Sequence, residues 1–324
     1  DVSRLQGAHK TIAILQIAIQ EKDQALIKQC IAELVAMGEA AVGPLNDLLR
    51  TGEGDTALWA AAALARIGTP TAAGALLDQL AQAREGTYKE QLARRVASIE
   101  NHESWPLLLD AMMQAGDAAV TRAAGESLSL MADTAIVDEL VARYSMASTP
   151  QETERLAQLI RNVRSSQASE ALLRLAGDVA SPPQDGLQQA ALDALARIGD
   201  APCVSHLLQR LEASPPGGGG SIFNAITQID SPQAHAALLY AAAGNKEVSA
   251  EQGRTAAIYA LKNYPDGQTV ALLERIVAQE QNAKVLTAAV RTLNDIQRVP
   301  HGVTAKADDL LKSEATLPLP PVAK

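Results

Sequence analysis

Apolar residues recur along this 324-residue chain with a helical spacing and with a second, longer period. Alanine-rich segments each end on an apolar anchor residue, and successive anchors are 30 to 35 residues apart. An apolar residue precedes each anchor by three positions, and a small or apolar residue precedes it by seven. Offsets of three, four and seven place these residues on one face of an α-helix. The nine anchors are Met37, Ile67, Ile99, Met131, Val163, Ile198, Ile229, Tyr264 and Ile296.

A second helix is expected after each anchor, because a pair of apolar residues follows about ten positions later in most units. The turns between the two helices carry the residues that end and begin helices. Gly38, Gly68 and Gly199 directly follow an anchor, where a left-handed residue ends a helix. Ser, Thr or Asp then caps the next helix, and Pro is tolerated in its first turn. These starting signals are Thr69-Pro70, Asp200 and Ser231-Pro232.

Residues 60–80 (AAAALARIGTPTAAGALLDQL) and 190–211 (AALDALARIGDAPCVSHLLQRL) carry the pattern most completely. They resemble the HEAT repeat, in the short form typical of phycobilin-lyase (PBS lyase) subunits. The resemblance covers about residues 20 to 300, and the other units keep the period while losing the Gly or the Pro. It implies an all-α fold of the armadillo type and a bacterial protein. The expected architecture is a right-handed α-solenoid (superhelix) of about nine HEAT-like helix pairs.

The ends of the chain fit the same array. Residues 9–20 are expected to form the first helix, and Val303–Lys312 a C-terminal capping helix with charges toward water. We therefore expect a single solenoid domain over residues 1–312 and a Pro-rich, flexible tail over 313–324. Breaker residues at 181–186 and 214–220 predict longer loops. The four glycines at 217–220 favour a linker over a phosphate-binding loop, because no Gly-Lys-Ser/Thr follows them.

Composition narrows the function classes. The chain has 28 Lys and Arg against 37 Asp and Glu, a formal charge of −9, so it lacks the broad positive field that nucleic acids require. No apolar run is long enough for a transmembrane helix. Two cysteines, Cys30 and Cys203, lie five repeats apart and are expected to stay unpaired. The localisation is left open, with a cytoplasmic protein slightly favoured. Because the chain begins at Asp1 rather than Met, an exported or periplasmic protein whose signal peptide has been removed is the alternative.

The sequence offers no set of residues that predicts chemistry. His102-Glu103 is a single His-Glu pair, whereas a di-iron site takes about half a dozen His and carboxylate ligands. His206 and His235 occupy unequal positions in their repeats, with no Cys or carboxylate recurring beside them to complete a metal shell. Cys203 and His206 lie three apart on one helix without an orienting acid. We therefore predict no catalytic residue, metal or cofactor, and no enzyme.

The candidate binding residues lie on the Ala-rich helix that ends at each anchor, taken here as the second helix of a HEAT pair, which lines the concave side in HEAT-type solenoids. Positions one, two, five and nine before the anchor point away from the buried face, and arginines gather on them and beside them. Their guanidinium groups pair well with carboxylates. The alternative is a solvated face whose Arg stems cover Ala-rich helices. The candidates are Arg66, Arg94, Arg95, Arg122, Arg155, Arg161, Arg197, Asn224, Gln228, Tyr259, Lys262 and Arg291.

The predicted function is a non-catalytic scaffold or adaptor that binds a protein or peptide partner, acidic in character, along this concave face. The alternative, from the resemblance alone, is an enzyme or enzyme subunit of the bilin-lyase kind, which attaches or chaperones a chromophore.

Overall fold

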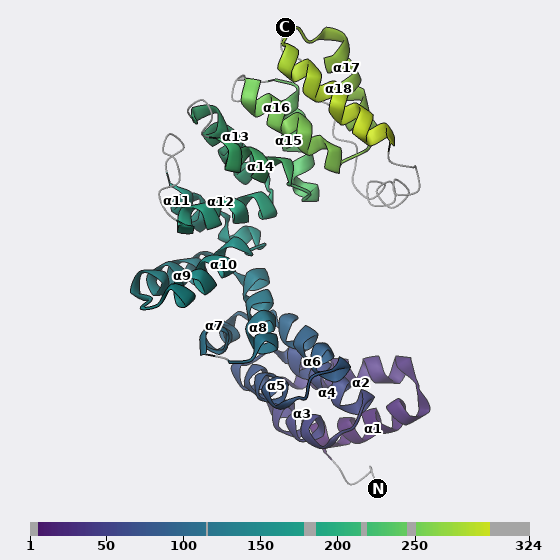
Figure 1. Ribbon diagram of the computed structural model, residues 1–324. Coiled ribbons are helices and arrows are strands. Elements are labelled where there is room, and N and C mark those ends of the chain that lie inside the picture. Colours follow the sequence, from purple (N-terminus) through teal and green to yellow (C-terminus); the bar gives the residue numbers. More distant parts are fainter. Residues whose placement is uncertain (1–5, 115, 178–185, 215–218, 245–250, 299–324) are drawn as a thin grey trace. The chain divides into compact units, whose positions relative to one another are not determined.

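The computed structural model describes residues 6–114, 116–177, 186–214, 219–244 and 251–298. Over these residues the chain forms eighteen α-helices and no strand (Figure 1), which confirms the all-α class and is consistent with HEAT-like repeats. The handedness and the number of repeats stay predictions. The capping helix expected at 303–312 and the tail at 313–324 lie outside the described residues, as do residues 181–185 and 215–218 of the two loops.

The helices fall into two compact units, which we describe one at a time. Unit 1 comprises Asp1–Ala132 and Met146–Leu159, and unit 2 comprises Asp133–Ser145 and Ile160–Lys324. The division reflects which residues contact one another and does not define independently folding domains. One domain over residues 1–312 therefore stays a prediction.

Unit 1 consists of two layers of helices. The even-numbered helices α2, α4, α6 and α8 contact one another in succession, and so do the odd-numbered helices α1, α3, α5 and α7. Each layer buries the apolar face of the other, as stacked helix pairs require. The elements are α1 (Ala8–Glu21), α2 (Gln24–Met37), α3 (Glu39–Thr51), α4 (Asp55–Ile67), α5 (Pro70–Gln82), α6 (Thr87–Ala97), the 3₁₀ turn η2 (His102–Ser104), α7 (Trp105–Gln114), α8 (Ala118–Met131) and α10 (Pro150–Arg161), which belongs to unit 1 up to Leu159.

Unit 2 repeats this arrangement. Helices α12, α14, α16 and α18 contact one another in succession, as do α11, α13 and α15. Its elements are α9 (Thr134–Met146), which belongs to unit 2 up to Ser145, η3 (Ser166–Ala168), α11 (Ser169–Ala176), α12 (Gly186–Ile198), α13 (Ala201–Ala213), α14 (Gly220–Thr227), η4 (Pro232–Ala234), α15 (His235–Ala242), α16 (Glu251–Ala260), η5 (Leu261–Asn263), α17 (Gly267–Gln279) and α18 (Ala283–Arg298).

The core consists of the apolar face expected from the period. The residue seven before the anchor is buried for all nine anchors, and the residue three before it is buried in all cases except Leu293, which is half-buried. The anchors are buried apart from Met37, Tyr264 and Ile296, which are half-buried. Burying one such Leu or Ile contributes about 1.5–3 kcal/mol. The predicted buried face is confirmed.

The turns confirm most of the expected signals. Gly68 ends α4 in the left-handed conformation at φ 63°, and Thr69 and Asp200 accept backbone N–H groups at the starts of α5 and α13. Ser231-Pro232 differs, because it begins a single 3₁₀ turn that leads into the following α-helix, and His102–Ser104 forms the same kind of turn before α7. Such turns are common at helix N-termini. The sequence signal therefore marks the start of the helical segment but not its first α-helical turn.

Side chains of one repeat satisfy free carbonyls of the preceding repeat. The last carbonyls of an α-helix have no partner within it. Asn101 Nδ2 donates to the carbonyl of Ile67 at 3.4 Å, Ser127 Oγ to that of Ile99 at 2.7 Å, and Asn263 Nδ2 to that of Ile229 at 2.8 Å. In each case the acceptor is an anchor residue. These bonds fix the register of successive repeats as well as the ends of the helices.

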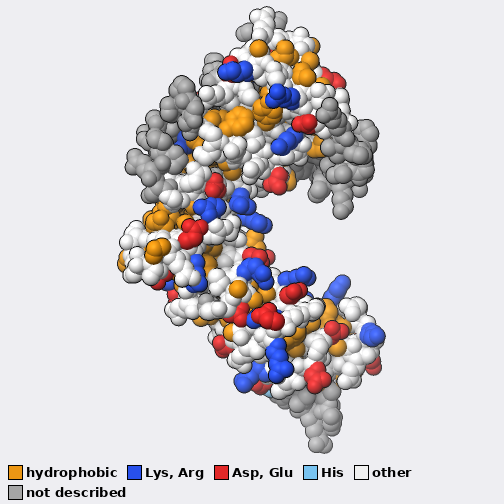
Figure 2. Space-filling model, viewed as in Figure 1, with side chains coloured by type: hydrophobic (Ala, Val, Ile, Leu, Met, Phe, Trp, Pro, Cys, Tyr) orange, Lys and Arg blue, Asp and Glu red, His pale blue; other side chains and the backbone are white. Residues whose placement is uncertain are grey.

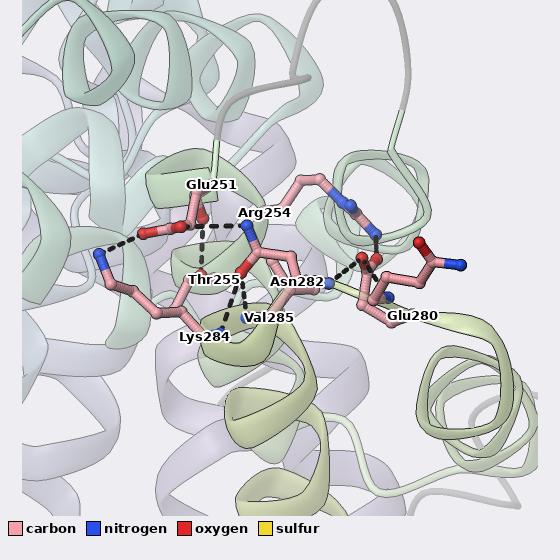
Figure 3. A network of polar contacts seen from close by, with 8 residues as sticks. Glu251, Arg254, Thr255, Glu280, Asn282, Lys284 and Val285 are labelled. Carbon is pink, nitrogen blue, oxygen red and sulfur yellow. Dashed lines mark hydrogen bonds and ion pairs between the residues drawn. The ribbon is translucent and has the colours of Figure 1, made fainter.

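An ion-pair network joins α16 to the turn between α17 and α18 in unit 2 (Figure 3). Arg254 Nη2 lies 2.6 Å from Glu280 Oε2, and Lys284 Nζ lies 2.5 Å from Glu251 Oε1. Asn282 donates its side-chain N–H to Glu251, and its backbone N–H to Glu280. The backbone N–H of Asn282 and the Arg254 guanidinium lower the pKa of Glu280. The network therefore ties neighbouring repeats together around ionised carboxylates.

Candidate functional site

Most candidate binding residues are available to a partner. The exposed ones are Arg66, Arg94, Arg95, Arg122, Arg197, Asn224, Gln228, Lys262 and Arg291, and the half-buried ones are Arg155, Arg161 and Tyr259. All lie on even-numbered helices or, for Gln228 and Lys262, directly after one. Whether a partner binds there stays a prediction.

The three half-buried candidates contact neighbouring repeats. Arg155 Nη1 donates to the carbonyl of Met113 at 2.9 Å, and Arg161 Nε lies 3.1 Å from Asp193 Oδ2. The ring of Tyr259 packs edge-on against Phe223, with the centroids 6.0 Å apart. These contacts give the three side chains a structural role and leave less of each for a partner.

In unit 1, two candidates line a hollow over the even-numbered helices, which we call the Trp59 hollow. Its volume is about 450 Å³. Arg94 and Arg95 of α6 lie on one side of it, and Leu58 and Trp59 of α4 form its apolar part. Gln24, Asp55 and Gln91 complete the lining. The hollow therefore combines an aromatic ring, two guanidinium groups and one carboxylate.

In unit 2, two other candidates line a second hollow over the even-numbered helices, which we call the Arg197 hollow. It has a volume of about 480 Å³, and Arg197 of α12 and Gln228 after α14 both line it. Its other lining residues are Arg164, Asp193, Ala196, Ala225 and Asp230. A neighbouring hollow of about 320 Å³ shares Arg164, Arg197 and Asp230 with it and extends along residues 231–233. A groove thus runs from α12 and α14 to the turn before α15.

Several lining residues are not among the predicted binding residues, although each stands at a regular position relative to an anchor. Trp59 and Gln91 both stand eight residues before an anchor, and Arg164 and Asp230 both directly follow one. The offsets chosen on the helix surface were one, two, five and nine before the anchor. They leave out position eight, apart from the flanking residue Arg155, and they stop short of the turn. In the structure, the turn residues face the same space as the helices.

The arginines of both hollows are free to bind a ligand. Among the residues that the structure describes, no carboxylate lies within ion-pair distance of Arg94, Arg95, Arg164 or Arg197. In each unit, basic and acidic side chains lie interspersed on the surface (Figure 2). The charge therefore acts locally, at the hollows, and does not form a broad positive field.

Cys203 and His235 have structural roles. Cys203 is fully buried, and burial together with Asp200 raises its pKa to about 12, so little thiolate forms near neutral pH. His235 Nε2 lies 2.9 Å from Thr269 Oγ1, its Nδ1 lies 3.5 Å from Asp266, and its ring stacks on Tyr264. Burial lowers the pKa of His235. Thr269, the residue that His235 contacts, is fully buried, so this contact belongs to the core and does not face a ligand.

His, Cys, Asp and Glu side chains are dispersed over the described part of the chain. No group of three or more His, Cys, Asp or Glu side chains gathers there as a metal site would require. No described helix combines the length and the apolar character needed to cross a membrane. Both cysteines are free and buried.

Comparison with known proteins yields distant structural likenesses. No family model and no curated protein matches the chain. Among solved structures, human deoxyhypusine hydroxylase in complex with glycerol aligns with a TM-score of 0.31 and 16% identity, over 81% of this chain and 98% of that one. A structure described as a computational design of self-assembling cyclic protein homo-oligomers aligns with a TM-score of 0.18 and 14% identity, over 95% and 96%.

One prediction is corrected by this comparison. The sequence led us to predict that the chain is not an enzyme, and a solved structure to which it is similar is an enzyme, deoxyhypusine hydroxylase. We withdraw that prediction. Its physical basis was weak, because ligands drawn from separate repeats leave no compact motif in a sequence. At this TM-score and identity the likeness carries no argument about catalysis in this chain.

Proposed function

We propose that this chain is a HEAT-like repeat protein that binds a protein or peptide partner with acidic side chains along the exposed face of its even-numbered helices. The observation that carries the proposal is the pair of hollows over these helices, one in each unit. Each hollow is lined by two arginines that make no ion pair with a described carboxylate. The right-handed array of about nine helix pairs is part of the same proposal.

The chemistry of the hollows supports an acidic partner. A guanidinium group offers paired N–H donors that match a carboxylate. Binding a partner here does not require an ion pair between these arginines and a described carboxylate to break first. A protein of net charge −9 repels an acidic partner at long range, so attraction has to come from local arginine pairs. The proposal therefore predicts contacts at the hollows and not a general affinity for anions.

Charge reversal within the Trp59 hollow is expected to weaken binding. The variant Arg94→Glu with Arg95→Glu replaces two pairing groups by two repelling ones, and we expect the Kd of the partner to rise at least about tenfold. Partners are first recovered from the source cells on the immobilised wild-type chain and identified by mass spectrometry. The Kd of the purified partner is then measured by titration calorimetry for each variant.

A matched control separates this effect from a change in net charge. Arg50 and Arg84 are exposed, form no ion pair with a described residue and lie outside the even-numbered helices. Reversing both to Glu changes the charge by the same amount and is expected to leave the Kd within about twofold. Equal losses in the two variants would contradict the proposal, as would a wild-type chain that retains no protein.

The Arg197 hollow provides a second, separate variant. Arg164→Glu with Arg197→Glu is also expected to raise the Kd, since both side chains are exposed and line that hollow. Exposed substitutions of this kind usually change the free energy of unfolding by less than about 0.5 kcal/mol. Unchanged circular dichroism and thermal unfolding show that the variants remain folded.

A further inference from the structure

We propose that the Trp59 hollow is an anchor site for a peptide segment in which one large apolar side chain, preferably aromatic, is flanked by acidic residues. This inference rests on the proposed function and specifies the chemistry of the partner at one place. The apolar side chain packs against Trp59, and the flanking carboxylates pair with Arg94 and Arg95.

The fold brings the lining residues together from three neighbouring repeats. Helices α2, α4 and α6 contact one another in succession (Figure 1). Gln91, Arg94 and Arg95 are spaced i, i+3 and i+4 on α6, so they share one face of that helix. Leu58 and Trp59 lie on the adjacent helix α4. At about 450 Å³, the hollow has room for a few side chains of a peptide.

Trp59 provides the apolar contact. Its side chain is half-buried, although most large apolar residues of unit 1 lie in the core. Its indole N–H donates to no described residue, so the ring and the donor are both available. Trp and Arg are the side chains most often found where a few residues supply most of the binding energy of an interface. Here one Trp and two Arg line one hollow.

The charges around Trp59 favour a peptide over a nucleotide. An aromatic ring with arginines can also stack a base and pair with a phosphate. Asp55 lies in the lining, and its carboxylate repels a phosphate and a peptide carboxylate alike, but it can accept an N–H from a peptide backbone, which a nucleotide does not have. The interspersed surface charge and the net charge of −9 oppose a polyanion further. A nucleotide is therefore the alternative that the experiment must exclude.

The two tryptophans allow the inference to be tested on the full chain by ¹⁹F NMR. The protein is labelled with 5-fluorotryptophan, and Trp59→Phe assigns the resonance of Trp59; Trp105, on α7, serves as the internal reference. The probe is acetyl-Gly-Glu-Phe-Glu-Gly-amide. The controls are the same peptide with Gln for both Glu, the same peptide with Ala for Phe, and adenosine monophosphate.

The first peptide is expected to shift the Trp59 resonance saturably, with the Trp105 resonance unchanged. Its affinity should exceed that of either control peptide by at least about fivefold, and Arg94→Gln with Arg95→Gln should abolish the advantage of Glu over Gln. Equal affinities for the three peptides, a stronger effect of adenosine monophosphate, or no shift of Trp59 by any peptide would each overturn the inference.

Failure of this inference can be told apart from failure of the proposed function. If the partner binds the Trp59→Ala and wild-type chains equally, and Arg164→Glu with Arg197→Glu still weakens it, the anchor site is wrong and the binding face stands. If neither pair of arginine reversals changes the Kd, the binding face itself is wrong.

Discussion

Replacing Leu195 by Ala is expected to lower the free energy of unfolding of unit 2 by about 2–5 kcal/mol. Leu195 stands three residues before the anchor Ile198 in α12, and none of its surface is exposed. Helix α12 packs against α11, α13 and α14, so the cavity opens where several helices meet. Hydrogen exchange of the α12 amides measures the loss locally, without requiring the whole chain to unfold in two states.

Leu293→Ala is the matched control, because Leu293 occupies the same position of its repeat but is half-buried. Truncating the half-buried Leu293 side chain removes less apolar contact. We therefore expect a smaller decrease in the free energy of unfolding, near the low end of the same range of about 2–5 kcal/mol. If Leu195→Ala destabilised the protein no more than Leu293→Ala does, the repeat period would not define the core.

Gly68→Ala is expected to destabilise unit 1 by roughly 2–5 kcal/mol, as the sum of two costs. A residue with a Cβ in the left-handed conformation costs about 1–2 kcal/mol, and forcing packed atoms apart costs about 1–3 kcal/mol more. Gly68 has φ 63°, and a Cβ there would lie 2.9 Å from the Cβ of Asn101 in the next repeat. Thermal and urea unfolding of the variant measure the effect.

Gly74→Ala makes the same chemical change where the opposite sign is expected. Gly74 lies within α5, and a Cβ there would meet only Leu107 Cδ2, at an ordinary 3.7 Å. Ala is favoured over Gly inside a helix by about 0.5–1 kcal/mol. Equal destabilisation by the two substitutions would contradict the account of Gly68 as the residue that lets successive repeats approach.

Local features of the fold were predictable from the sequence because each depends on few residues. The helix expected at 9–20 forms over Ala8–Glu21, and Gly68 ends α4 as its position requires. The bonds between repeats were not predictable from the period. Asn101 and Ser127 have no common place in the pattern, yet both donate to anchor carbonyls, since the chain satisfies free carbonyls with whatever side chain lies near.

The sequence predicted which helices carry the candidate site but not the shape of the hollows on them. Exposed arginines on even-numbered helices followed from helical geometry, and Arg94, Arg95 and Arg197 do line hollows. Arg155 contacts Met113 and Arg161 pairs with Asp193 because residues of an adjacent repeat lie within their reach. Whether an arginine makes such a contact depends on a neighbour 32 or 42 residues away in these two cases, and a pattern within one helix does not contain that information.

Hydroxyl-radical footprinting of the complex with the recovered partner tests the central claim most directly, because it reads side chains on both layers of helices in one experiment. Trp59, Phe223 and Tyr259 are half-buried residues of the even-numbered helices α4, α14 and α16. Leu107, Met146 and Tyr240 are exposed residues of the odd-numbered helices α7, α9 and α15. The account predicts that the partner protects the first set, Trp59 above all, and leaves the second set as reactive as in the free chain. Protection confined to the odd-numbered helices would contradict it.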